Sequence, residues 1–235
     1  MPVVRRIAAA VLPVWLWAAT ASAGEAERYR LDPVHTRVMF AIDHAGFSKA
    51  IGTVSGSTGT LEFDPEDWRS ARLEASVPMT RIDLGDAAWN RATLAGNLLD
   101  AEDHPVATFV STRIEPLAPD RATVHGTLTL RGVSREIALE VKLNALKRHP
   151  LPPFRRTVGF SATGTLSRKD FGIDAWASVI GDSVELRIEA EAVRDRGDAP
   201  EAEVKPEPKS DPAGATETAP PASSPPETAA AAFRT

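Results

Sequence analysis

An alternation of apolar and polar residues with a period of two constrains this chain more than any other feature. From Val184 to Ala192, every second side chain is apolar, and Glu or Arg occupies each position between them. A β-strand points successive side chains to opposite faces, so this period is typical of half-buried strands. The same alternation recurs in 38–42, 71–77, 124–130 and 137–143, and apolar centres at Leu61–Phe63, Phe109 and Phe160 bring the expected total to about eight strands.

Short turns separate these segments. Asp64–Asp67, Ala118–Asp120 and Arg131–Val133 carry the Pro, Asp and Gly residues that favour tight turns. Many strands joined by short turns, with no helices alternating between them, predict an all-β fold. An antiparallel sandwich or barrel is therefore expected.

One segment breaks the period of two. Between Asp86 and Leu99 the apolar residues return at helical spacing, and Asp86 is a suitable N-cap, so we expect a helix of about three turns. Pro105 then returns the chain to an extended path. Such a helix either covers one mouth of a barrel or packs at a core edge, and the pattern leaves both open.

The N-terminal residues predict export. Arg5 and Arg6 precede an uncharged run, Ile7 to Ala21, which ends in the small-residue pattern Ala21-Ser22-Ala23. These are the parts of a cleaved secretory signal peptide spanning residues 1–23, which places the protein in the periplasm or outside the cell. The run is short for a bilayer span, which needs roughly 20 apolar residues.

The C-terminal segment 194–235 has a different composition from the core. It contains eight prolines and only one aromatic residue, Phe233. A segment this poor in apolar residues buries too little surface to offset its ordering entropy, so we expect a disordered Pro/Ala/Glu-rich tail. Residues 24–193 remain as one domain, which is long enough to bury a core.

Composition excludes several classes of function. The chain has no cysteine, which excludes thiolate zinc sites, c-type haem attachment and disulfides. Its net charge is −5 and no basic stripe is present, so nucleic acid is not an expected partner. The five histidines lack metal-ligand spacing, and Gly159–Thr163 lacks the final glycine of a nucleophile elbow. We therefore expect no metal, no cofactor and no catalytic residue.

The order and spacing of several short motifs resemble those of the YceI-like family of exported lipid-binding proteins. The resemblance covers about Tyr29 to Val193. Its pieces are Tyr29–Asp32 with His35-Thr36, Val38–Phe40, His44–Gly46, Gly52, Gly96–Pro105, Phe109–Thr112, Val124–Val133, Arg168–Ile173 and Ile180–Val184.

The resemblance implies a lipocalin-like, antiparallel, eight-stranded barrel with one inserted short helix. It also implies a ligand inside the barrel, an isoprenoid quinone, a polyprenyl phosphate or another long amphiphile. The chain departs from the family in the helix, where the family's Arg-Asp and His-Leu pairs are replaced by Trp89-Asn90 and Ala92-Thr93. Leu98 and Leu99 stand where phenylalanines are usual. These departures leave the contacts to a ligand's head group open.

Twelve residues are the candidate ligand-binding set. The expected tunnel lining is Phe40, Ile42, Leu94, Leu98, Phe109, Leu128, Phe160 and Trp176, and the expected mouth residues are His44, Asn90, Arg91 and Asn97. Arg91 is singled out because a guanidinium pairs well with a phosphate or a quinone oxygen.

The sequence thus favours an exported, non-enzymatic carrier that meets the membrane only transiently to exchange its ligand. Two other interpretations stay open. One is a stress-related interaction protein with a solidly packed barrel; the other is a hydrolase or isomerase acting on a similar amphiphile, which needs His44 or His125 beside a carboxylate in the cavity. The oligomeric state is also open, with a homodimer among the options.

Overall fold

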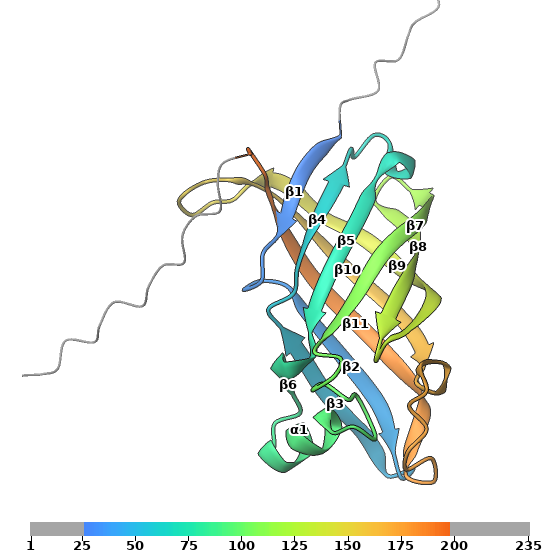
Figure 1. The fold of residues 1–235 in the computed structure, drawn as a ribbon. Helices are drawn as coiled ribbons and strands as arrows, with labels where there is room; N and C mark the ends of the chain where they lie inside the picture. The colour runs from blue at the N-terminus through green and yellow to red at the C-terminus, as the bar shows by residue number, and fades with distance from the viewer. Residues whose placement is uncertain (1–25, 198–235) are drawn as a thin grey trace, which may run out of the picture. The chain divides into compact units, whose positions relative to one another are not determined.

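The computed structural model describes residues 26–197. The expected signal peptide and all but the first four residues of the expected tail lie outside them. The described residues form an antiparallel sheet and one α-helix (Figure 1). The strands are β1 (Glu27–Leu31), β2 (Arg37–His44), β3 (Ser48–Ser55), β4 (Thr58–Phe63), β5 (Arg72–Pro78), β6 (Ile82–Asp83), β7 (Val106–Ala118), β8 (Arg121–Leu130), β9 (Val133–Arg148), β10 (Arg156–Ser167) and β11 (Ile180–Arg194). The helix is α1 (Ala87–Leu94), and the 3-10 turns are η1 (Trp68–Ser70), η2 (Met79–Arg81) and η3 (Lys169–Phe171).

These eleven segments occupy eight strand positions of a closed barrel. β1 pairs with β4 while β2 pairs with β3, and β4 pairs with β5 while β3 pairs with β6. The pairs β1–β2, β3–β4 and β5–β6 are therefore three long strands, each interrupted once. β11 closes the ring because it pairs with both β1 and β2. The predicted eight-stranded antiparallel barrel with a single short helix is confirmed.

The three interruptions lie beside one another across the paired strands. Between β1 and β2, the Asp32 carboxylate accepts hydrogen bonds from the backbone N–H groups of Val34 and His35. Between β3 and β4, Gly56 has a φ of +80°, which favours glycine. η2 separates β5 from β6. Local breaks of this kind bend long strands and allow a sheet to curve into a closed barrel.

One end of the barrel is packed solid. Tyr29 and Val158 are fully buried there, and Phe63 makes edge-to-face contacts with Trp68 and Phe160 at centroid distances of 5.1 and 5.4 Å. We call this cluster the aromatic plug; it consists of Tyr29, Leu61, Phe63, Trp68, Val158 and Phe160. The opposite end carries the β2–β3 hairpin, α1 and the loop between β10 and β11, and we call it the α1 end (Figure 1).

The helix begins where the sequence predicts and ends earlier. Oδ1 of Asp86 accepts hydrogen bonds from the N–H groups of Ala88 and Trp89, which confirms it as the N-cap. The helix stops at Leu94 instead of Leu99. Ala95 is extended, and the N–H groups of Asp100 and Ala101 bond to the carbonyls of Ala95 and Leu94, which closes a compact turn. No helix in residues 26–197 is long and apolar enough to cross a bilayer.

A carboxylate at the start of the barrel links the first strand to the last two. Glu27 on β1 accepts a hydrogen bond of 2.5 Å from the Tyr29 hydroxyl and forms ion pairs with Arg156 on β10 and Arg194 on β11 at 2.9 and 3.2 Å. Burial raises the pKa of Glu27, but the Tyr29 hydrogen bond and the two guanidinium charges outweigh it and hold this pKa below its ordinary value.

The substitution Glu27→Gln is therefore expected to lower the free energy of unfolding at pH 7 by up to about 1 kcal/mol, because the charge-assisted contacts are lost while the shape is kept. A carboxyl group with a lowered folded-state pKa stabilises the fold above its unfolded-state pKa, and this contribution disappears as the pH falls through the folded-state value. Urea unfolding at pH 7 and pH 3 measures the effect. An equal loss at both pH values would show that the charge of Glu27 is not its source.

Candidate ligand-binding cavity

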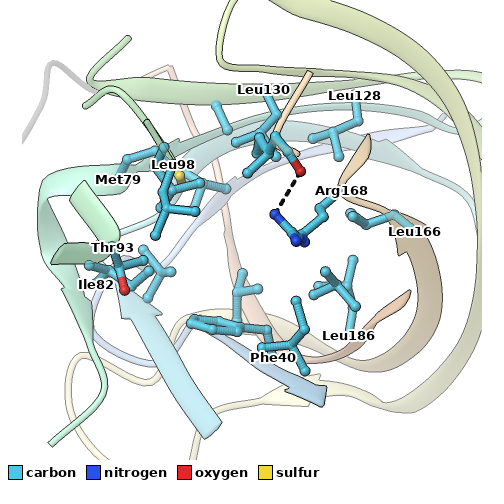
Figure 2. A pocket seen from close by; sticks show the side chains of 18 of the residues that line it. Phe40, Met79, Ile82, Thr93, Leu98, Leu128, Leu130, Leu166, Arg168 and Leu186 are labelled. Carbon is cyan, nitrogen blue, oxygen red and sulfur yellow. Dashed lines mark hydrogen bonds between the residues drawn. The ribbon is translucent and has the colours of Figure 1, made fainter. Parts of the chain in front are cut away.

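Between the aromatic plug and the α1 end, the barrel encloses a cavity of about 630 Å³. This volume lies within the range of small-molecule binding sites. Side chains from strands all around the ring, from α1 and from the β10–β11 loop line it, and most of them are aliphatic or aromatic. Figure 2 shows Phe40, Met79, Ile82, Leu98, Leu128, Leu130, Leu166 and Leu186 arranged around the interior.

The alternation in β11 gives the cavity its length. Val184, Leu186, Ile188 and Ala190 all line it, while the charged residues between them face outward. At about 3.3 Å per residue, the strand from Val184 to Ala190 spans roughly 20 Å. Outside, Glu185 pairs with Lys49 on β3. The cavity is therefore long and apolar, a shape that suits a flexible chain.

Two glycines keep aromatic rings against the wall. Gly52 on β3 is directly opposite Phe40 on β2, and a Cβ atom added to Gly52 would lie 2.3 Å from the tip of that ring. Gly126 on β8 lies opposite Ser111 on β7, and a Cβ atom added to Gly126 would lie 2.3 Å from the tip of the Phe109 ring of that strand. Each ring thus occupies the space that a side chain on the neighbouring strand would fill. The cavity gains apolar lining here because the missing side chains leave room for the rings at the wall.

Aromatic and polar residues surround the cavity at the α1 end. The His44 ring lies 5.3 Å from the Trp89 ring of α1, and both residues line the cavity together with Asn97. Trp176, in the β10–β11 loop, lines the cavity and is 63% exposed. Phe47, at the tip of the β2–β3 hairpin, is 92% exposed. The exposed aromatic rim consists of Phe47, Trp89 and Trp176.

Eight of the twelve predicted site residues line the cavity. They are Phe40, Ile42, His44, Asn97, Leu98, Phe109, Leu128 and Trp176. The other four are not part of the lining. Phe160 belongs to the aromatic plug, and Leu94 packs against a buried cluster around Met79 and Ile82.

The polar residues predicted from α1 have other surroundings. Asn90 accepts a hydrogen bond from the N–H of Leu84 and donates one to Asp83, so it fastens α1 to β6. Arg91 is exposed on α1 and is not in the lining. The structure thus places the predicted apolar residues of the strands in the cavity and leaves the predicted guanidinium outside it.

A different arginine, absent from the predicted set, lines the cavity. Arg168 follows β10 directly and is only 3% exposed. It donates hydrogen bonds to four backbone carbonyls, two in the loop that leads into β11 and two at the start of β11. Sequence reasoning missed it because an arginine beside a turn is usually exposed. Its only signal was its place in the motif Arg168–Ile173, which carried the resemblance and no assigned role.

The described residues offer few side chains for metal binding or proton transfer at the cavity. Residues 26–197 contain no cluster of three or more His, Asp or Glu side chains that could hold a metal ion. His125 contacts Glu115 at 3.2 Å, but neither residue lines the cavity. His44 and Asp43 both line the cavity, and the Asp43 carboxylate accepts a hydrogen bond from the N–H of Gly46. Within the described part of the chain, no hydrogen bond joins His44 to a carboxylate.

Comparison with known proteins agrees with this architecture. The family model of the YceI-like domain matches residues 29–192. A UPF0312 protein of Pectobacterium atrosepticum is 30% identical over 180 residues, which cover 76% of this chain and 92% of that protein. Protein YceI of Escherichia coli O157:H7 is 30% identical over 179 residues, with coverage of 75% and 92%.

Solved structures show the same fold at lower identity. BcnA of Burkholderia cenocepacia superposes with a TM-score of 0.62 at 21% identity, covering 68% of this chain and 98% of BcnA. A polyisoprenoid-binding domain of Saccharophagus degradans, implicated in plant cell wall breakdown, gives a TM-score of 0.55 at 14% identity, with coverage of 71% and 98%.

Replacing Gly52 by alanine is expected to displace the Phe40 ring into the lumen and to weaken the binding of an apolar fluorescent dye such as ANS about tenfold, because one added methyl group in a packed wall shifts its neighbours. Gly159→Ala is the matched control, since the nearest atom to a Cβ there is 3.9 Å away and the strand position has room. Fluorescence titration measures both variants. Unchanged dye affinity in Gly52→Ala would contradict the role assigned to the glycine.

Proposed function

The chain belongs to the YceI-like family, and from this premise we propose that it is an exported carrier for an isoprenoid, or a similar long amphiphile, held inside the barrel. The observation that carries the proposal is the long apolar cavity of about 630 Å³, closed at one end by the aromatic plug. The polyisoprenoid-binding domain of Saccharophagus degradans, which shares the fold, supports the same ligand class.

The physical reason for such a carrier is the cost of exposing a hydrocarbon chain to water. Each methylene group that moves from water into an apolar site contributes roughly 0.8 kcal/mol. A chain with many such groups crosses an aqueous compartment only inside an apolar shelter. A lining of aliphatic residues from all around the ring is such a shelter, and it does not select for a particular pattern of groups along the hydrocarbon chain.

The two alternatives receive less support. A packed barrel acting only as an interaction protein predicts no cavity, whereas this barrel has one. A hydrolase or isomerase would need His44 or His125 paired with a carboxylate inside the cavity. The His125–Glu115 pair is not part of the lining, and Asp43, which lines the cavity with His44, bonds to the N–H of Gly46. We therefore propose a binding protein and not an enzyme.

Residues 1–23 support a periplasmic or extracellular location, and the aromatic rim supports transient contact with a membrane. Tryptophan and phenylalanine side chains partition into the interface between lipid and water. Phe47 is 92% exposed beside the opening of the cavity and does not pack into the protein core. A rim that dips into the lipid surface would let an apolar chain pass between bilayer and cavity without entering water.

Native mass spectrometry of the protein purified gently from its own host tests the carrier proposal. We expect one bound isoprenoid or fatty compound per chain, identified by lipid extraction of the same sample. A clean ligand-free mass that does not change after incubation with quinones, polyprenyl phosphates and fatty acids would overturn the proposal.

The substitution Phe47→Ser is expected to slow ligand transfer to and from lipid vesicles about tenfold, with unchanged equilibrium affinity, because Phe47 is outside the cavity lining and partial burial of one aromatic ring is lost. The measurement is stopped-flow transfer of a pyrene-labelled fatty acid from phosphatidylcholine vesicles. Phe154→Ser provides the control, since Phe154 is 51% exposed in the β9–β10 loop at the opposite end. Equal slowing in both variants would argue against a rim at the α1 end.

A further inference from the structure

The interior of this barrel contains a buried positive charge. Arg168 is 3% exposed, yet its side chain lines a cavity whose other residues are mostly hydrocarbon. Figure 2 shows its nitrogen atoms directed toward the interior, near Leu128, Leu166 and Leu186. The guanidinium group of arginine carries a full positive charge. A buried charge is costly unless it is paired and hydrogen-bonded.

The hydrogen bonds of Arg168 leave one donor over. Nε donates to the carbonyl of Gly181 at 2.7 Å, and Nη1 donates to the carbonyls of Ile173 and Ala175 at 2.8 and 2.9 Å. Nη2 donates to the carbonyl of Ile180 at 2.9 Å. A guanidinium has five N–H groups. Four of them bond to carbonyls of the β10–β11 loop and the start of β11, and the described residues provide no partner for the second N–H of Nη2.

The charge of Arg168 also has no counterion in direct contact. Within residues 26–197, no ion pair includes Arg168. The Asp182 carboxylate accepts hydrogen bonds from the N–H of Lys169 and the hydroxyl of Ser167, and these bonds lower its pKa more than the charge of Arg168 does. Asp182 is not in the lining. Carbonyl dipoles solvate the cation, and a net positive charge remains at the cavity wall.

We propose that Arg168 is the head-group site of the cavity, and that its free Nη2–H binds a single electron-rich oxygen at the polar end of the ligand. This inference rests on the proposed carrier function and specifies which chemical group the polar end of the ligand carries. A carboxylate, phosphate or carbonyl oxygen accepts the hydrogen bond, and an anionic oxygen also offsets the buried charge. A pure hydrocarbon leaves both unsatisfied.

The position of Arg168 also orients the ligand. The residue lies where β10 ends, at the α1 end of the barrel, in the loop that carries Trp176 at the mouth. The inward-facing residues of β11 continue from there to Ala190, next to the aromatic plug. The polar end therefore lies toward the mouth, and the apolar chain points toward the plug.

A variant at Arg131 serves as the control that distinguishes head-group binding from loop support. Its guanidinium also donates to loop carbonyls, those of Gly172 and Gly96 at 2.9 Å each, but Arg131 does not line the cavity. Arg131→Met therefore removes a support of the same loop and keeps the cavity charge. Arg168→Met removes both loop support and charge.

The first experiment titrates oleate labelled with ¹³C at its carboxyl carbon, bound to the unaltered protein, by NMR. A nearby cation favours the charged form of a carboxyl group, so the pKa of oleate bound beside Arg168 is expected to stay below about 5. In an apolar cavity without a cation, desolvation raises a carboxyl pKa by up to several units. A raised pKa in the unaltered protein overturns the inference while leaving the carrier function intact. If no amphiphile binds at all, the carrier function itself fails.

The second experiment compares affinities of the two variants for oleate, a short-chain ubiquinone and squalene. Arg168→Met is expected to weaken oleate binding about 10- to 100-fold, as for loss of a charge-assisted hydrogen bond, and to leave squalene unaffected. Arg131→Met should bind all three as the unaltered protein does. A larger loss for oleate than for the quinone identifies an anionic head group, and equal losses identify a carbonyl oxygen. Equal weakening of squalene in Arg168→Met would show that the arginine only supports the loop.

Discussion

Closure of the sheet is the constraint on which the rest of this structure depends. β11 hydrogen-bonds to β10 on one side and to both β1 and β2 on the other, so no long strand edge is left unpaired around the ring. Once the sheet is closed, every second side chain of each strand faces the interior. The outward charges of β11 and its inward aliphatic residues follow from this one condition. The interior is then either filled by side chains or left for a ligand.

The interior of this barrel is filled by side chains at one end and left open as a cavity toward the other. At the end opposite α1, Tyr29, Phe63 and Trp68 fill the interior, and the edge-to-face contact of Phe63 with Trp68 is part of this solid packing. Toward the α1 end, the large rings of Phe40 and Phe109 lie against the wall over Gly52 and Gly126. The plug provides packing and stability, and the glycine-backed wall provides volume. A protein that must hold a chain without losing its fold benefits from dividing its interior in this way.

Arg168 both supports the loop at the mouth of the cavity and places a positive charge there. Its four carbonyl contacts tie the loop between β10 and β11 to the start of β11, and the same side chain brings a positive charge to the cavity wall. Moving a cation from water into the protein interior costs free energy, and the carbonyl dipoles offset only part of that cost. A loop stabilised in this way provides a rigid frame for Trp176 and leaves a polar point in an apolar site.

The sequence by itself determined the strands, the turns and the helix start, because the period of two, the turn residues and the Asp86 N-cap are local properties of the chain. It also indicated most of the lining, since Phe40, Ile42 and Leu128 face inward by alternation alone. Tertiary structure decided how far along the barrel each inward residue lies, which assigned Phe160 to the plug and Phe109 to the cavity. It also decided which arginine is buried. Nothing local in the sequence marks Arg168 as buried and Arg91 as exposed. The difference comes from the folding of the β10–β11 loop around the Arg168 guanidinium, because burial depends on tertiary contacts.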